Sequence, residues 1–167
     1  MMARLRICIP LLLLLAASTA VAGQKGDKGE DPPAAEQKEP KNTGPTAVLD
    51  DIQEGWTSSN ADLILRHFGS GKVAISIDGS GPGGAYSRDQ GYYLFKELFK
   101  STVTSKFVFV QIRKSNDDGT ATFAIAERRY QRRDDGRQIK DKVYIAMHAE
   151  PVTGGNRWVL DEIKSIR

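Results

Sequence analysis

The chain has 167 residues, a formal net charge of +3 and one cysteine. Arg4 and Arg6 account for two of the excess positive charges, so the chain without its first segment carries a net charge of +1. A charge this close to neutral argues against nucleic acid as a partner. Cys8 lies in the same first segment, so the remaining chain has no cysteine to form a disulfide.

Residues 1–22 have the pattern of a cleavable signal peptide. Two arginines precede an apolar run over residues 7–17, and small residues follow up to Ala20-Val21-Ala22. The run is shorter than the ~20 residues that span a bilayer. We therefore expect export, periplasmic or extracellular, with cleavage near Ala22 and no transmembrane segment in the mature chain. An uncleaved membrane anchor is the alternative.

Residues 23–45 contain glycine, proline and charged residues and almost nothing apolar. Such a segment buries too little surface to offset the entropy lost on ordering, so we predict a disordered leader. Residues 46–167 are long enough for one domain with one hydrophobic core.

Three helices are predicted from apolar spacing and capping residues. The first begins at Ala47 after Thr46, and the second covers 61–68 after Asn60. The third opens with a capping box at Ser87–Gln90 and has Tyr92 on its apolar side.

Alternating β-branched segments predict the strands. One covers 72–78 and is followed by a glycine-rich segment, 79–84, which we interpret as a flexible turn rather than a phosphate-binding loop. Four more cover 106–114, 120–132, 139–149 and 158–166, with turns at 116–119, 134–136 and 153–156. The predicted class is α+β, in the order α-α-β-α-β-β-β-β, with an antiparallel sheet.

This order resembles the nuclear transport factor two-like superfamily, whose cystatin-like α+β roll curls a sheet around a long helix to form a cone. The segment 85–99 and the closing segment 158–164 are similar to an uncharacterised exported bacterial branch, a family of unknown function. The resemblance implies the fold and an exported location. It also implies a homodimer through the sheet, because many members of the superfamily dimerise in this way.

Three residues are candidates for ligand binding. A tight turn at Asp135-Gly136 would place Arg128 opposite Val143 and Tyr130 opposite Asp141, with Arg128 on the small apolar face of its strand. There it could hold a ligand carboxylate through both arms of its guanidinium group. Tyr86 is placed at the mouth of the cone. We expect the cone to be filled mainly by six residues: Phe95, Leu98, Phe99, Ile145, Met147 and Trp158.

Catalytic candidates are His148 and Asp161. His148 suits a general base if its strand face lines the cone, and an inward Asp161 suits proton abstraction. Asp161 and Glu162 occupy adjacent strand positions, so at most one of them faces inward. We expect His67 to be a partly buried structural residue. The sequence predicts no metal site and no cofactor.

The hairpin 128–142 has a local charge excess of +4, which suits either an anionic surface or a solvated sheet face. Two functions follow. The first is a non-enzymatic exported domain that binds a small anionic or apolar ligand, an anionic surface or a protein. The alternative is a lyase or isomerase, which requires at least two of Tyr86, Arg128, His148 and Asp161 to converge on one enclosed cavity.

Overall fold

A computed structural model describes residues 44–114 and 119–166. The predicted signal peptide and most of the predicted leader lie outside the described residues, as does most of the turn predicted at 116–119. The order of elements is α1 (Pro45–Ser58), α2 (Ala61–Leu65), β1 (Val73–Ser76), β2 (Gly84–Tyr86), α3 (Arg88–Ser101), β3 (Thr102–Lys114), β4 (Ala121–Arg132), β5 (Gln138–Val152) and β6 (Gly155–Ile166). The class is α+β, as predicted.

The helices differ from prediction mainly at their ends. The first begins at Pro45 without a side-chain cap, so the cap predicted at Thr46 is wrong. Proline suits the first helical position, where its missing N–H is not needed. The caps at Asn60 and Ser87 are confirmed, and Ser87 and Gln90 form the full capping box. The second helix stops at Leu65, earlier than predicted.

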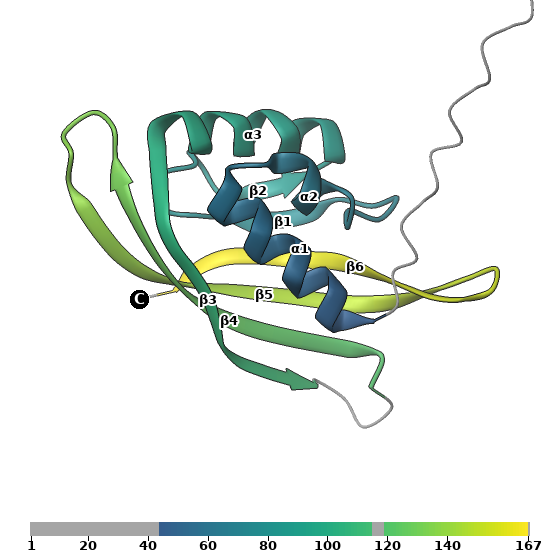
Figure 1. Cartoon of the computed structure of the whole chain (residues 1–167). Helices are drawn as coiled ribbons and strands as arrows, with labels where there is room; N and C mark the ends of the chain where they lie inside the picture. Colours follow the sequence, from purple (N-terminus) through teal and green to yellow (C-terminus); the bar gives the residue numbers. More distant parts are fainter. Residues whose placement is uncertain (1–43, 115–118, 167) are drawn as a thin grey trace, which may run out of the picture. The chain divides into compact units, whose positions relative to one another are not determined.

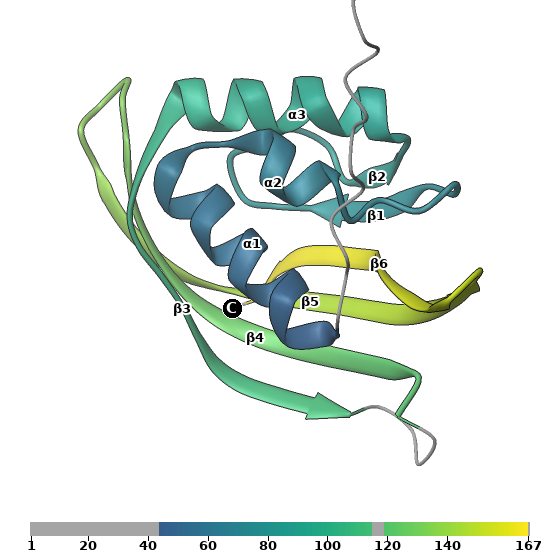
Figure 2. The ribbon, with the colours of Figure 1, turned by 45° about the vertical axis from the view of Figure 1, so that its right-hand side comes forward.

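The six strands form one curved sheet in the order β2-β1-β6-β5-β4-β3. All neighbours are antiparallel except β1 and β6, which run parallel, so the purely antiparallel sheet that we predicted is wrong at this pair. The end of the glycine-rich segment was also misread. Gly84 begins β2, which pairs with β1 through Ile75. In Figure 1 and Figure 2 the helices lie on the concave side of the sheet.

The β4–β5 hairpin has a different register from the one predicted. Arg128 lies opposite Asp141 and Tyr130 opposite Ile139, a shift of two residues. The cause is a longer turn, in which the Gly136 N–H donates to the Arg132 carbonyl at 3.1 Å and Gly136 adopts a φ of 68°. A shift of two residues preserves the faces of a strand. Arg128 therefore still lies on the side of Ala126, as predicted.

The hydrophobic core fills the concave side of the sheet. All six residues predicted to fill the cone are buried: Phe95, Leu98, Phe99, Ile145, Met147 and Trp158. Trp56 from α1 stacks on Phe107 from β3 with ring centroids 5.0 Å apart. Tyr92 was expected in the core but is 38% exposed, and Leu94 is buried in the same helix instead.

None of the helices in the described residues lies over the opposite, convex face of the sheet (Figure 2). Its side chains are those that alternate with the buried positions of β4 and β5. Pairing carries this face onto β3, where Lys106 lies opposite Arg129, and onto β6, where Lys164 lies opposite Tyr144. We call this surface the outer face.

Candidate functional site

The most unusual residue of the interior is Arg128, whose side chain is fully buried. Its Nε donates to Asp141 Oδ1 at 2.9 Å, and its Nη2 donates to Asp141 Oδ2. The partner is the residue directly opposite on β5. We predicted that Arg128 makes a bidentate contact with a ligand carboxylate, but this contact is already made by a carboxylate of the chain itself.

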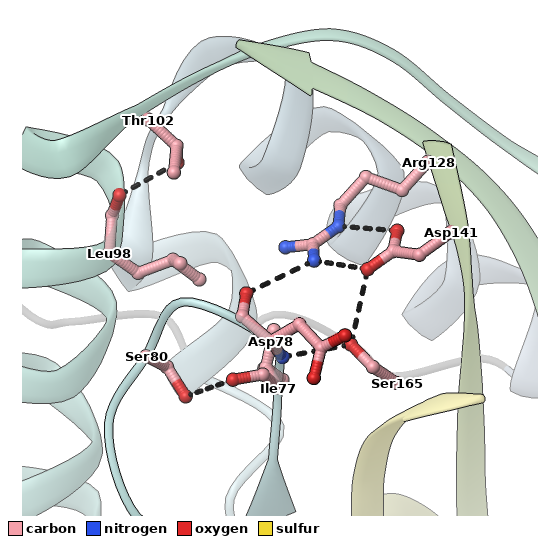
Figure 3. Close-up of polar contacts among 8 residues, drawn as sticks. All are labelled: Ile77, Asp78, Ser80, Leu98, Thr102, Arg128, Asp141 and Ser165. Carbon is pink, nitrogen blue, oxygen red and sulfur yellow. Dashed lines mark hydrogen bonds and ion pairs between the residues drawn. The ribbon is translucent and has the colours of Figure 1, made fainter. Parts of the chain in front are cut away.

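Further contacts connect this pair to the other strands (Figure 3). Arg128 Nη2 also donates to the Asp78 carbonyl at 3.3 Å. Ser165 Oγ donates to Asp141 Oδ2 at 3.2 Å and accepts from the Asp78 backbone N–H at 3.0 Å. The network joins β4, β5 and β6 to the segment that follows β1. Burial of an ion pair is favourable only when such hydrogen bonds satisfy its polar atoms.

Two aromatic rings flank the guanidinium group of Arg128. Its central carbon lies 4.1 Å from the ring centroid of Tyr130 and 5.0 Å from that of Trp56. Rings in these positions attract a cation through their negative faces. Burial also raises the pKa of Tyr130, with Arg128 acting in the opposite direction.

Two buried side-chain nitrogens among the described residues have no hydrogen-bond partner, Arg128 Nη1 and Trp56 Nε1. A buried donor that is left without an acceptor lowers the free energy of unfolding by about 1–3 kcal/mol. Arg128 therefore has one nitrogen, Nη1, whose two N–H groups are free to donate to an acceptor such as a carbonyl oxygen or a water molecule.

An open groove of about 820 Å³ lies at one end of the cone, between the end of α3 and the β4–β5 hairpin. Tyr130 and Thr102 line it together with charged residues of both signs, among them Lys100, Arg133 and Asp134. Arg132 forms an ion pair with Asp134, and this contact lowers the pKa of the Asp134 carboxyl group. The groove is open to solvent, whereas the centre of the cone is packed.

The other predicted site residues lie away from Arg128. Tyr86 donates its hydroxyl hydrogen bond to the Pro82 carbonyl of the preceding loop. His148 lies on the outer face, since the buried neighbour Met147 takes the inner side, so the condition for a role as general base inside the cone is not met. Asp161 also points outward, and its Oδ1 lies 2.7 Å from His148 Nδ1.

A β-bulge explains the position of Asp161. Pairing between β5 and β6 shifts register between Ala146 and Met147, which lie opposite Glu162 and Leu160. Strict alternation is lost at this point, so Leu160 and Ile163 are both buried while Asp161 is exposed. The expectation that one of the two acids could face inward fails for this reason, and Glu162 pairs with Lys164 at 2.9 Å.

His67 is buried, with 3% of its surface exposed. Its Nε2 lies 2.7 Å from Asp51 Oδ2, a contact between the α2 end and α1. Burial lowers the pKa of His67, and the bond to Asp51 opposes that effect only in part. The prediction of a structural histidine is confirmed in its burial.

No cluster of three or more metal-ligating side chains occurs in residues 44–114 and 119–166. Within the same ranges no helix is long and apolar enough to cross a membrane.

Comparison with solved structures identifies the fold. A DUF4783 family protein from Bacteroides fragilis superposes with a TM-score of 0.51 at 15% identity, over 69% of this chain and 93% of its own. A ketosteroid isomerase-like protein from Erwinia carotovora superposes with a TM-score of 0.55 at 9% identity, over 73% of this chain and 93% of its own. A domain of unknown function with a cystatin-like fold from Nostoc punctiforme superposes with a TM-score of 0.54 at 11% identity, over 72% of this chain and 73% of its own.

These likenesses give the chain the nuclear transport factor two-like fold, as the sequence resemblance implied. At such low identities they carry the fold and no activity. No family model matches the chain, and no curated protein matches it.

Proposed function

We propose that the chain is an exported, non-enzymatic binding domain that contacts its partner through the surface of its sheet and not through the interior of the cone. The proposal rests on the contacts of Arg128, most of whose donors are already bound within the chain. Its Nε and Nη2 donate to Asp141, and its central carbon lies over the rings of Tyr130 and Trp56. Of its three nitrogens, Nη1 alone remains for a ligand.

The enzymatic alternative lacks the convergence that it requires. A lyase or isomerase needs at least two polar groups aimed at one enclosed reaction site. Among the predicted residues, His148 and Asp161 do meet, but both side chains are more than 40% exposed on the outer face. Tyr86 is occupied by its own loop. These placements support binding over catalysis.

The uncovered sheet face provides the surface for binding. Phe123 stacks on Tyr144 with ring centroids 5.7 Å apart, and Ile125 and Val108 lie beside them on the outer face. Val108 is 40% exposed. Aromatic and aliphatic side chains in such a position commonly mark an interaction surface.

A native mass spectrum of the chain from residue 23 onward, purified from its own host, tests this proposal. We expect a bare protein, a complex with a second protein, or an adduct that is lost when outer-face residues are changed. A stoichiometric small molecule that survives those changes would contradict the proposal. Tyr130→Phe, which keeps the ring beside Arg128, then shows whether such a molecule occupies the groove.

A further inference from the structure

The register of the sheet forces three cations into one row on the outer face. Lys106 lies directly opposite Arg129, and Arg129 lies directly opposite Lys140. Neighbouring strands are ~4.8 Å apart, so the three side chains begin within about 10 Å of one another. Like charges in directly opposite positions destabilise a sheet. An anion bound to these three side chains would reduce their mutual repulsion and stabilise the folded chain.

The next row supplies only part of the missing negative charge. Glu127 lies 3.7 Å from the ammonium group of Lys106 and 3.8 Å from that of Lys140. Lys142 lies opposite Glu127 and adds a further cation. Among the described residues, no carboxylate lies within ion-pair distance of Arg129 or Lys142. The two rows therefore hold four cations against one carboxylate.

A groove of about 470 Å³ borders two of the three cations of this row. Arg129 and Lys140 line it with polar side chains from the same strands, including Gln131 and Gln138. Gln131 is oriented by the bond from its Nε2 to the Gly136 carbonyl at 3.0 Å. The site thus combines a guanidinium group, an ammonium group and amide donors, which suits the oxygens of a phosphate.

We propose that this cationic row binds the phosphate groups of an anionic phospholipid surface. The inference rests on the proposed function and names its site and partner. Four cations spread over three strands exceed what one small anion needs, whereas a lipid surface presents many phosphates side by side. Val103 and Val108 are 41% and 40% exposed beside the row, so apolar side chains can follow the charges to the interface.

The charge of the adjacent turn extends the same surface. Arg137 is exposed at the tip of the β4–β5 hairpin. Each Lys or Arg close to an anionic membrane contributes to binding, and salt screens that contribution. Binding through this row is therefore strong at low salt and weak at high salt.

The experiment measures co-sedimentation of the chain from residue 23 onward with vesicles. Phosphatidylcholine vesicles containing phosphatidylglycerol are compared with pure phosphatidylcholine vesicles, at low and high salt. The test variant is Arg129→Gln with Lys140→Gln. The matched control is Lys72→Gln with Lys96→Gln, which removes the same charge from exposed positions elsewhere. Circular dichroism melting checks that both variants fold.

We expect binding to the anionic vesicles only, roughly 30-fold weaker in the test variant and little changed in the control. Equal binding by the test variant and the control would overturn the inference. Loss of vesicle binding in millimolar inorganic phosphate but not in sodium chloride of equal ionic strength would assign the site to free phosphate, and would overturn the lipid source. Failure to bind any vesicle would overturn the inference while leaving the mass-spectrometric test of the proposed function unaffected.

Discussion

At the scale of single residues, the buried ion pair of Arg128 and Asp141 connects β4 to β5 and depends on the register of the two strands. Of this pair, only Arg128 was predictable as a buried residue. The alternation of β4 was enough to place Arg128 beside Ala126 on the buried side. Asp141 was read only as one charge of a basic hairpin, because the assumed tight turn put it opposite Tyr130. Turn length sets hairpin register, and a composition of Asp-Asp-Gly does not distinguish a two-residue turn from a longer one. The hydrogen bond from Ser165 to Asp141 was not predictable either, because it depends on how the strands pair.

Asp141→Asn is expected to destabilise the chain by about 3–5 kcal/mol, because it leaves the guanidinium group of Arg128 buried without its counter-charge. Chemical denaturation measures the change. Arg128→Met combined with Asp141→Leu should restore most of the loss, since apolar residues of similar size often replace a buried ion pair at little cost. A double variant less stable than Asp141→Asn would show that the network contributes more than charge balance.

His67 predicts a pH dependence of stability. Its pKa is lowered in the folded chain by burial, whereas in the unfolded chain it has the ordinary value of about 6.5. As the pH falls through 6.5, the unfolded state takes up a proton before the folded state does. The free energy of unfolding therefore falls with decreasing pH in this window.

Thermal melts of the wild type and of His67→Gln between pH 7.5 and about 5 measure this effect. The variant should lose part of the dependence, and His148→Gln, which removes a partly exposed histidine, should retain it. Identical slopes for the wild type and His67→Gln would rule out the assignment.

At the scale of elements, the long periodic segments were predictable and the short or irregular ones were not. The capping box of α3 and the alternation of β4 fix those elements locally. The three-residue strand β2 contains Gly84, which gives no strand signal of its own, and exists only because it pairs with β1. The bulge beside Asp161 likewise follows from pairing with β5.

Close packing of α3 against α2 gives a prediction for Gly91. A Cβ atom there would lie 2.9 Å from Phe68 Cε2 and 3.1 Å from Leu65 Cδ2. Alanine improves helix propensity by about 1 kcal/mol, but overpacking a core costs about 1–3 kcal/mol. We expect Gly91→Ala to lower the midpoint of thermal unfolding.

Gly71→Ala is the control for that substitution, because nothing lies within 4 Å of its Cβ position and its φ is not positive. The control should be neutral or slightly stabilising through the unfolded state. A Gly91→Ala variant more stable than the control would mean that α2 and α3 separate more easily than the structure implies.

At the scale of the whole molecule, function depends on which face of the sheet meets a partner. The concave face is filled by the core, and the outer face carries more cations than carboxylates. The cations are Lys106, Arg113, Arg129, Lys140, Lys142 and Lys164, and the carboxylates include Glu127, Asp161 and Glu162. The excess of positive charge in the hairpin was predictable from composition, but its arrangement in rows depends on the register of the strands.

The homodimer through the sheet that the family resemblance implies stays a prediction, and the charge of the outer face sets its salt dependence. Two copies meeting through this face would bring their cation rows close together, and salt screens such repulsion. We expect self-association through the outer face to weaken as the salt concentration is lowered. Sedimentation velocity at several salt concentrations measures it, and a dimer that strengthens at low salt would place the interface elsewhere.

The most direct test of the account compares two double variants that remove equal charge from opposite sides of the hairpin. Arg129→Gln with Lys140→Gln changes the outer face, and Lys100→Gln with Arg133→Gln changes the groove at the end of the cone. Binding of each protein to an envelope extract of the host is measured at low salt. The account predicts that the outer-face variant loses binding and the groove variant retains most of it. Loss of binding in the groove variant alone would contradict the account and return the functional site to the mouth of the cone.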